Sequence, residues 1–135
     1  MLPAEAPYHV EVVDDPGAGF AHGAAGISFA LLQLFAVTGE EPYRETALGG
    51  IGYERSLFVR EVGNWPDLRT GDQGKQARQF AATWCNGGSG IGLARLGGLA
   101  AFDTSAIRDD IDAAANVARS AGTGGVDHLC CGNLG

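Results

Sequence analysis

The residues of this sequence best suited to chemistry are its three cysteines, Cys85, Cys130 and Cys131. Their odd number argues against a disulfide framework, no Cys-x-x-Cys pair marks a zinc finger, and isolated cysteines are usually small buried apolar residues. However, the cysteines and His22 all lie one or two residues before a Gly-x-x-Gly motif, where the backbone can approach a ligand closely. Three protein ligands with an open fourth position are typical of catalytic zinc.

Three of the Gly-x-x-Gly stretches, at residues 23–26, 87–90 and 132–135, share a common setting. The residue directly before each of them is His22, Asn86 or Cys131, and the first two motifs lead into apolar stretches. A glycine loop repeated before successive helices indicates an array of similar helical hairpins. In a closed ring of such hairpins, equivalent loops converge on one rim, so residues far apart in the sequence could meet there.

The elements that must position these loops read as helices. Residues 26–38 are apolar nearly all round, which is typical of a buried helix, and Gly39 suits its C-terminal cap. A further helix is expected over residues 91–102. In the last helix, apolar residues recur at helical spacing from Ile107 to Ala118, after a cap at Asp103 or Thr104 and before Gly122.

A helix is also predicted from about Pro42 to Val62, with charged residues such as Glu54 on its surface. Glycines within residues 49–52 either weaken this helix or allow close contact with a neighbour. Residues 64–67, Asn-Trp-Pro-Asp, predict a turn. Since only residues 10–13 hint at a strand, the predicted class is all-α.

Composition narrows the possible functions. The chain has 135 residues, enough for one domain, and its 45% hydrophobic content fits a packed core. A net charge of -7 without any basic stripe argues against nucleic acid as a partner. No stretch reaches the roughly 18 apolar residues of a membrane span. The N-terminus does not read as a signal peptide, so a cytoplasmic location is expected.

Three motifs resemble those of lanthionine synthetase C-like cyclases, and they stand in the family's order. Residues 19–26 match G-x-x-H-G-x-x-G, residues 84–90 match W-C-x-G-x-x-G, and residues 130–135 resemble a third motif that is usually C-H-G. Residues 64–69 are similar to a stretch of class II (LanM-type) lanthipeptide synthetases, which join a dehydratase to a cyclase. The resemblance implies a helix-hairpin barrel, the α/α toroid, of which this chain would form part.

The resemblance also implies a domain division. Cys131 stands where most members have His, although a subgroup of class II enzymes carries this Cys-Cys pair. The family's first half, with its catalytic Asp, has no counterpart here. We therefore expect residues 19–135 to be the C-terminal part of a cyclase domain, incomplete at both ends, after an extended or irregular N-terminal segment over residues 1–18.

The activity implied by the resemblance is zinc-dependent formation of lanthionine and methyllanthionine, in which cysteine thiols of a precursor peptide add to dehydroalanine or dehydrobutyrine. Cys85, Cys130 and Cys131 would be the Zn²⁺ ligands, and His22 the catalytic acid/base, since imidazole changes charge nearest physiological pH. Trp84 either walls the substrate pocket or packs in the core. The implied partners are the dehydrated precursor peptide and either a dehydratase domain or the missing half of the cyclase.

Two alternatives to this activity stay open at the level of sequence. The chain could be a zinc-stabilised helical module that binds peptide without catalysis, or an inactive remnant of a cyclase. His128 could support the metal ligands from a second layer, but a solvated loop histidine is the simpler interpretation.

Overall fold

The computed structural model describes residues 17–68, 79–125, 127–129 and 131–132. These residues form the α-helices α1 (Ala24–Thr38), α2 (Glu41–Leu57), α3 (Gly88–Gly98) and α4 (Ser105–Ala121). Their only extended pairings are isolated β-bridges, so the all-α class is confirmed for this part of the chain. The strand hinted at by residues 10–13 lies outside the described residues. No helix among the described segments has the length and apolar character needed to cross a membrane.

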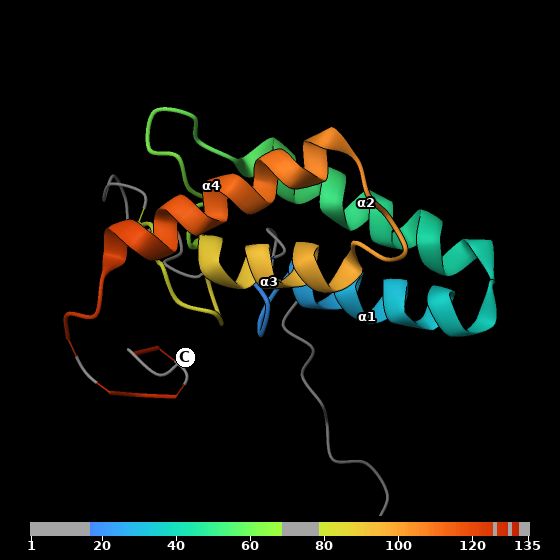
Figure 1. Ribbon diagram of the computed structural model, residues 1–135, viewed down its shortest axis with the longest axis horizontal. Coiled ribbons are helices and arrows are strands. Elements are labelled where there is room, and N and C mark those ends of the chain that lie inside the picture. The colour runs from blue at the N-terminus through green and yellow to red at the C-terminus, as the bar shows by residue number, and fades with distance from the viewer. Residues whose placement is uncertain (1–16, 69–78, 126, 130, 133–135) are drawn as a thin grey trace, which may run out of the picture.

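The helices form two hairpins that pack side by side. α1 packs against α2, α3 packs against α4, and α1 contacts α3. In Figure 1, α2 and α4 lie above α1 and α3. Each hairpin thus contributes one helix to each of two layers, and closure of such hairpins into an α/α toroid stays a prediction.

The first hairpin confirms the predicted helix cap at Gly39. Gly39 has φ of 70°, and its N–H donates to the carbonyl oxygen of Phe35 at 2.8 Å, which ends α1. A proline occupies the first turn of α2. A Cβ on Gly50 would overlap the hydroxyl of Ser28, so this glycine brings α2 close to α1. The glycines at residues 49–52 were expected either to weaken the helix or to allow close contact with a neighbour, and Gly50 does the second.

The prediction that the first helix is buried all round is wrong. This helix is α1, and its buried residues are Ala25, Ser28 and Leu32. In contrast, Ile27 is 64% exposed and Val37 is 86% exposed. α2 and α3 cover one side of α1, and no described residue covers the other. Because both sides of this helix are apolar, hydrophobic periodicity could not show which side is covered.

α2 ends at Leu57 instead of Val62, because the chain turns back on itself immediately afterwards. The N–H of Val59 donates to the carbonyl oxygen of Asn64 at 3.1 Å, and Gly63 between them has φ of 69°. The turn therefore precedes residues 64–67 rather than occupying them, which corrects the prediction. Trp65 is instead fully buried, and its ring centroid lies 4.6 Å from that of Phe58. Burial of this large apolar ring explains why the segment packs in the core.

The second hairpin agrees more closely with expectation. α3 begins at Gly88, three residues before the predicted start, and ends at Gly98. The hydroxyl of Thr104 accepts a hydrogen bond from the N–H of Ile107 at 3.3 Å and caps α4, which Gly122 ends. Ile107 and Ala114 are buried in α4.

Candidate functional site

The glycine loops in front of α1 and α3 are built alike. A Cβ on Gly23 or on Gly87 would overlap the carbonyl oxygen of the residue six positions earlier. Gly26 and Gly90, the second glycines of the two motifs, show the same relation to the carbonyl six positions before them. Only glycine leaves room for this close approach of backbone to backbone. The sequence repeat is therefore a structural repeat at these two loops.

Two of the three cysteines meet at the end of the second loop. Cys85 is 2% exposed, and its Sγ lies 3.6 Å from the Sγ of Cys131, which is exposed. This separation exceeds the roughly 2.05 Å of a disulfide. The hydroxyl of Thr83 lies 3.3 Å from the Cys85 Sγ. Cys130, the remaining predicted ligand, lies outside the described residues.

Trp84 links the second loop to the segment that carries Cys131. Its indole N–H donates to the carbonyl oxygen of Leu129 at 3.0 Å. Its ring centroid lies 5.8 Å from that of Phe20 in the first loop. Trp84 is therefore a half-buried side chain that contacts three segments of the chain. Its role as a wall of the substrate pocket stays a prediction.

His22 lies on the loop that abuts the loop of Cys85. The N–H of Ala21 donates to the carbonyl oxygen of Cys85 at 3.3 Å, which fixes the two backbones against each other. The His22 side chain is exposed and lines an open, largely apolar hollow together with Phe20 and Phe29. A peptide approaching from solvent can therefore reach this imidazole.

A second hollow opens beside Cys131 and has a volume of about 340 Å³. Its lining includes Thr83, Ser89 and Ala118, so both hydroxyl groups and small apolar groups face it. A cavity of this size can hold a side chain or a short stretch of peptide. The described part of the site thus brings together the buried thiol of Cys85, the exposed thiol of Cys131 and the exposed imidazole of His22.

The family model for lanthionine synthetase C-like protein matches residues 7–135. This chain belongs to the lanthionine synthetase C-like family. The match confirms at family level the resemblance drawn from the three glycine motifs. No curated protein and no solved structure matches the chain.

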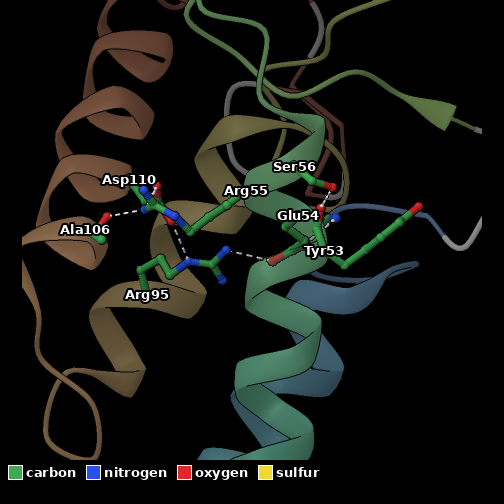
Figure 2. A network of polar contacts seen from close by, with 8 residues as sticks. Tyr53, Glu54, Arg55, Ser56, Arg95, Ala106 and Asp110 are labelled. Carbon is green, nitrogen blue, oxygen red and sulfur yellow. Dashed lines mark hydrogen bonds and ion pairs between the residues drawn. The ribbon is translucent and has the colours of Figure 1, made fainter.

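This family member also contains a buried network of charged side chains that the sequence motifs did not predict. Glu54 is fully buried, not exposed on α2 as expected, and its Oε2 lies 2.9 Å from Nη2 of Arg95 in α3. Nε of Arg95 contacts Asp110 of α4 at 3.1 Å, and Arg55 contacts the same carboxylate at 2.5 Å (Figure 2). Burial raises the pKa of Glu54, against the opposing effect of Arg95.

One signal of this network is visible in the sequence. Arg95 interrupts an otherwise apolar or glycine stretch at residues 91–102, and a charge in such a place needs a buried partner. Among the described residues of this family member, no group of three or more His, Cys, Asp and Glu side chains could hold a metal ion.

Proposed function

We propose that this chain acts in a zinc-dependent cyclase that forms lanthionine and methyllanthionine thioethers in a dehydrated precursor peptide. Membership of the lanthionine synthetase C-like family supports the cyclase class. The single observation that carries the proposal for these residues is the 3.6 Å separation of the Cys85 and Cys131 sulfur atoms, beside the loop that bears His22.

The donor set fits zinc. Two thiolates at about 2.3 Å from a tetrahedral Zn²⁺ stand about 3.8 Å apart, close to the observed 3.6 Å between Cys85 and Cys131. We propose Cys130 as the third ligand, which leaves one position for substrate. When bound, zinc would lower the pKa of a substrate thiol so that thiolate is available at neutral pH.

His22 is the proposed acid/base. In the reaction, the substrate sulfur forms a bond to the β-carbon of dehydroalanine or dehydrobutyrine, the carbon–carbon double bond is lost, and the α-carbon needs a proton. A protonated His22 can donate it, because its side chain is exposed in a hollow that admits a peptide. Trp84, through its bond to the carbonyl of Leu129, keeps the third motif next to the second.

We also propose the finer assignments that the motifs suggest. Residues 19–135 would be part of a class II cyclase domain in a helix-hairpin barrel, following a separate segment over residues 1–18. The precursor peptide and either a dehydratase domain or the remaining part of the cyclase would be its partners, in the cytoplasm.

Zinc content is the first test of the ligand assignment. The purified chain should hold one zinc, and Cys85→Ala should lose it, as measured by metal analysis after exhaustive dialysis. His128→Ala is the matched control, because His128 is exposed on the same segment as Cys131 and is not a proposed ligand. Zinc retained in Cys85→Ala, or lost in His128→Ala, would contradict the proposed ligand set.

Cyclisation is the second test, and it separates the proposed activity from the two alternatives. Thioether formation leaves the peptide mass unchanged but removes thiols that iodoacetamide would alkylate. His22→Asn should keep its zinc and lose this activity. Zinc with peptide binding but no loss of thiols would favour a binding module, and absence of zinc would favour an inactive remnant.

A further inference from the structure

Neither helix that follows a site loop has a capping side chain of its own. The N-cap residues of α1 and α3 are Gly23 and Gly87, and neither makes a side-chain cap hydrogen bond. For α3, the missing acceptor comes from elsewhere in the chain, because Oδ1 of Asn64 accepts the N–H of Gly88 at 3.1 Å. A helix start without its own cap depends on such a remote acceptor.

For α1, the remote acceptor is the carboxylate of Glu54. It accepts hydrogen bonds from the backbone N–H of Gly19, at 3.4 Å, and of Ala25 in the first turn. These residues stand three positions before and three positions after His22. One buried carboxylate therefore holds both ends of the segment that carries the proposed acid/base, at the positive end of a helix dipole.

The same segment also lies against the backbone of Cys85, whose carbonyl oxygen accepts the N–H of Ala21 at 3.3 Å. A Cβ on Gly19 would stand 2.7 Å from the carbonyl oxygen of Cys85. Gly19 of the His22 loop thus contacts both the Glu54 carboxylate and the loop of a proposed metal ligand. Displacement of Gly19 would change the position of His22 relative to Cys85.

Glu54 is itself fixed by charge. Arg95 pairs with it while fully buried, and Asp110 and Arg55 extend the network across α4 and α2, as Figure 2 shows. Buried ion pairs often give no more stability than apolar side chains of similar volume. A network of this kind on the His22 loop therefore suggests a role other than stability.

We propose that Glu54 is a positioning residue, which fixes the His22 loop against the Cys85 loop for the cyclase reaction proposed above, on which this inference rests. Zinc binding by the cysteines does not require the Glu54 contacts. Loss of these contacts should therefore leave metal content intact and affect only the placement of His22.

Amide hydrogen exchange on the full chain tests this role without any need for activity. Glu54→Asp keeps the charge beside Arg95 but shortens the side chain, so the amides of Gly19 and Ala25 should exchange faster by about tenfold or more. The amide of Gly88 should not change. Asn64→Ala is the matched control and should show the opposite pattern, with faster exchange at Gly88 and Trp65, whose N–H groups both donate to the Asn64 Oδ1, and no change at Gly19 or Ala25.

Faster exchange of all protected amides in Glu54→Asp, or no change at Gly19 and Ala25, would overturn the positioning role. If Glu54→Asp does not fold, Glu54→Gln keeps the length of the side chain but leaves one acceptor oxygen, for which Arg95 and the amides of Gly19 and Ala25 compete, so the same two amides should exchange faster. In cyclisation assays, Glu54→Asp should lower kcat with zinc content unchanged, and loss of zinc would overturn the assignment. A wild-type chain that does not cyclise would refute the proposed function, while the exchange pattern would still decide whether Glu54 fixes the loop.

Discussion

Replacing Gly87 by Ala tests most directly whether the site loops are built as described. Gly87 has φ of 99°, and a Cβ there would overlap the carbonyl oxygen of Ala81. This carbonyl cannot easily move, because Nδ2 of Asn64 donates to it at 3.0 Å. A non-glycine residue at such a φ costs about 1–3 kcal/mol, before the overlap is relieved.

We therefore expect Gly87→Ala to lower the free energy of unfolding by at least about 3 kcal/mol, a large share of the 5–15 kcal/mol typical of a domain. Gly49→Ala is the matched control, since Gly49 lies in α2 with open space around it. This change should raise stability by about 0.5–1 kcal/mol, because it lowers the entropy of the unfolded chain and favours helix.

Urea unfolding followed by circular dichroism at the helical band measures both changes. Opposite signs for the two glycine substitutions are the expected result. A Gly87→Ala chain within about 1 kcal/mol of wild type would refute the reasoning, because it would mean that the backbone at this loop does not approach the Ala81 carbonyl as closely as described.

Three further predictions follow from the contacts described. Arg95→Met should cost about 3–5 kcal/mol, because the buried Glu54 carboxylate loses Arg95 as its ion-pair partner while Asp110 keeps Arg55. Arg108→Met, in an exposed ion pair, should hardly shift the urea midpoint, and equal effects of the two changes would contradict this reasoning. Trp84→Phe keeps a ring near Phe20 but removes the indole N–H, so zinc affinity in chelator competition should fall about 10–100-fold. Unchanged affinity would show that the hydrogen bond to the carbonyl of Leu129, directly before the third motif, is dispensable. Thr104→Ala should destabilise the chain by about 1 kcal/mol through loss of the α4 cap, measured by thermal unfolding, and an unchanged midpoint would count against the cap.

Local signals predicted much of this structure. Gly39 and Gly122 act at helix ends where the backbone itself favours glycine, so one sequence was enough to place them, and it narrowed the cap of α4 to Asp103 or Thr104. The glycine repeat predicted the common build of two loops for the same reason, since close backbone approach excludes any side chain.

What the sequence could not show depends on contacts between distant segments. Glu54 looks like an ordinary charged helix residue until Arg95, 41 positions away, is brought beside it. Trp65 sits in a polar stretch with turn-forming residues, and only the burial of its ring overrides that local preference. The covered side of α1 is decided by its neighbours, because its own residues are apolar on both sides. The pairing of Cys85 with Cys131 followed from the repeat and the family resemblance, not from spacing alone.

The contact between Cys85 and Cys131 spans 46 positions of sequence, and the whole α3–α4 hairpin lies within that span. Any atom bound to both sulfur atoms would therefore close a loop around the hairpin, as a cross-link does. In the chain-entropy model, a covalent link closing a loop of this length restricts the unfolded chain by about 4 kcal/mol. Resistance of the segment between α4 and Cys131 to limited proteolysis would then report whether the two sulfur atoms are joined. The two sulfur atoms proposed to hold zinc would thus also stabilise the α3–α4 hairpin, through a cross-link that is lost when the bound atom is removed.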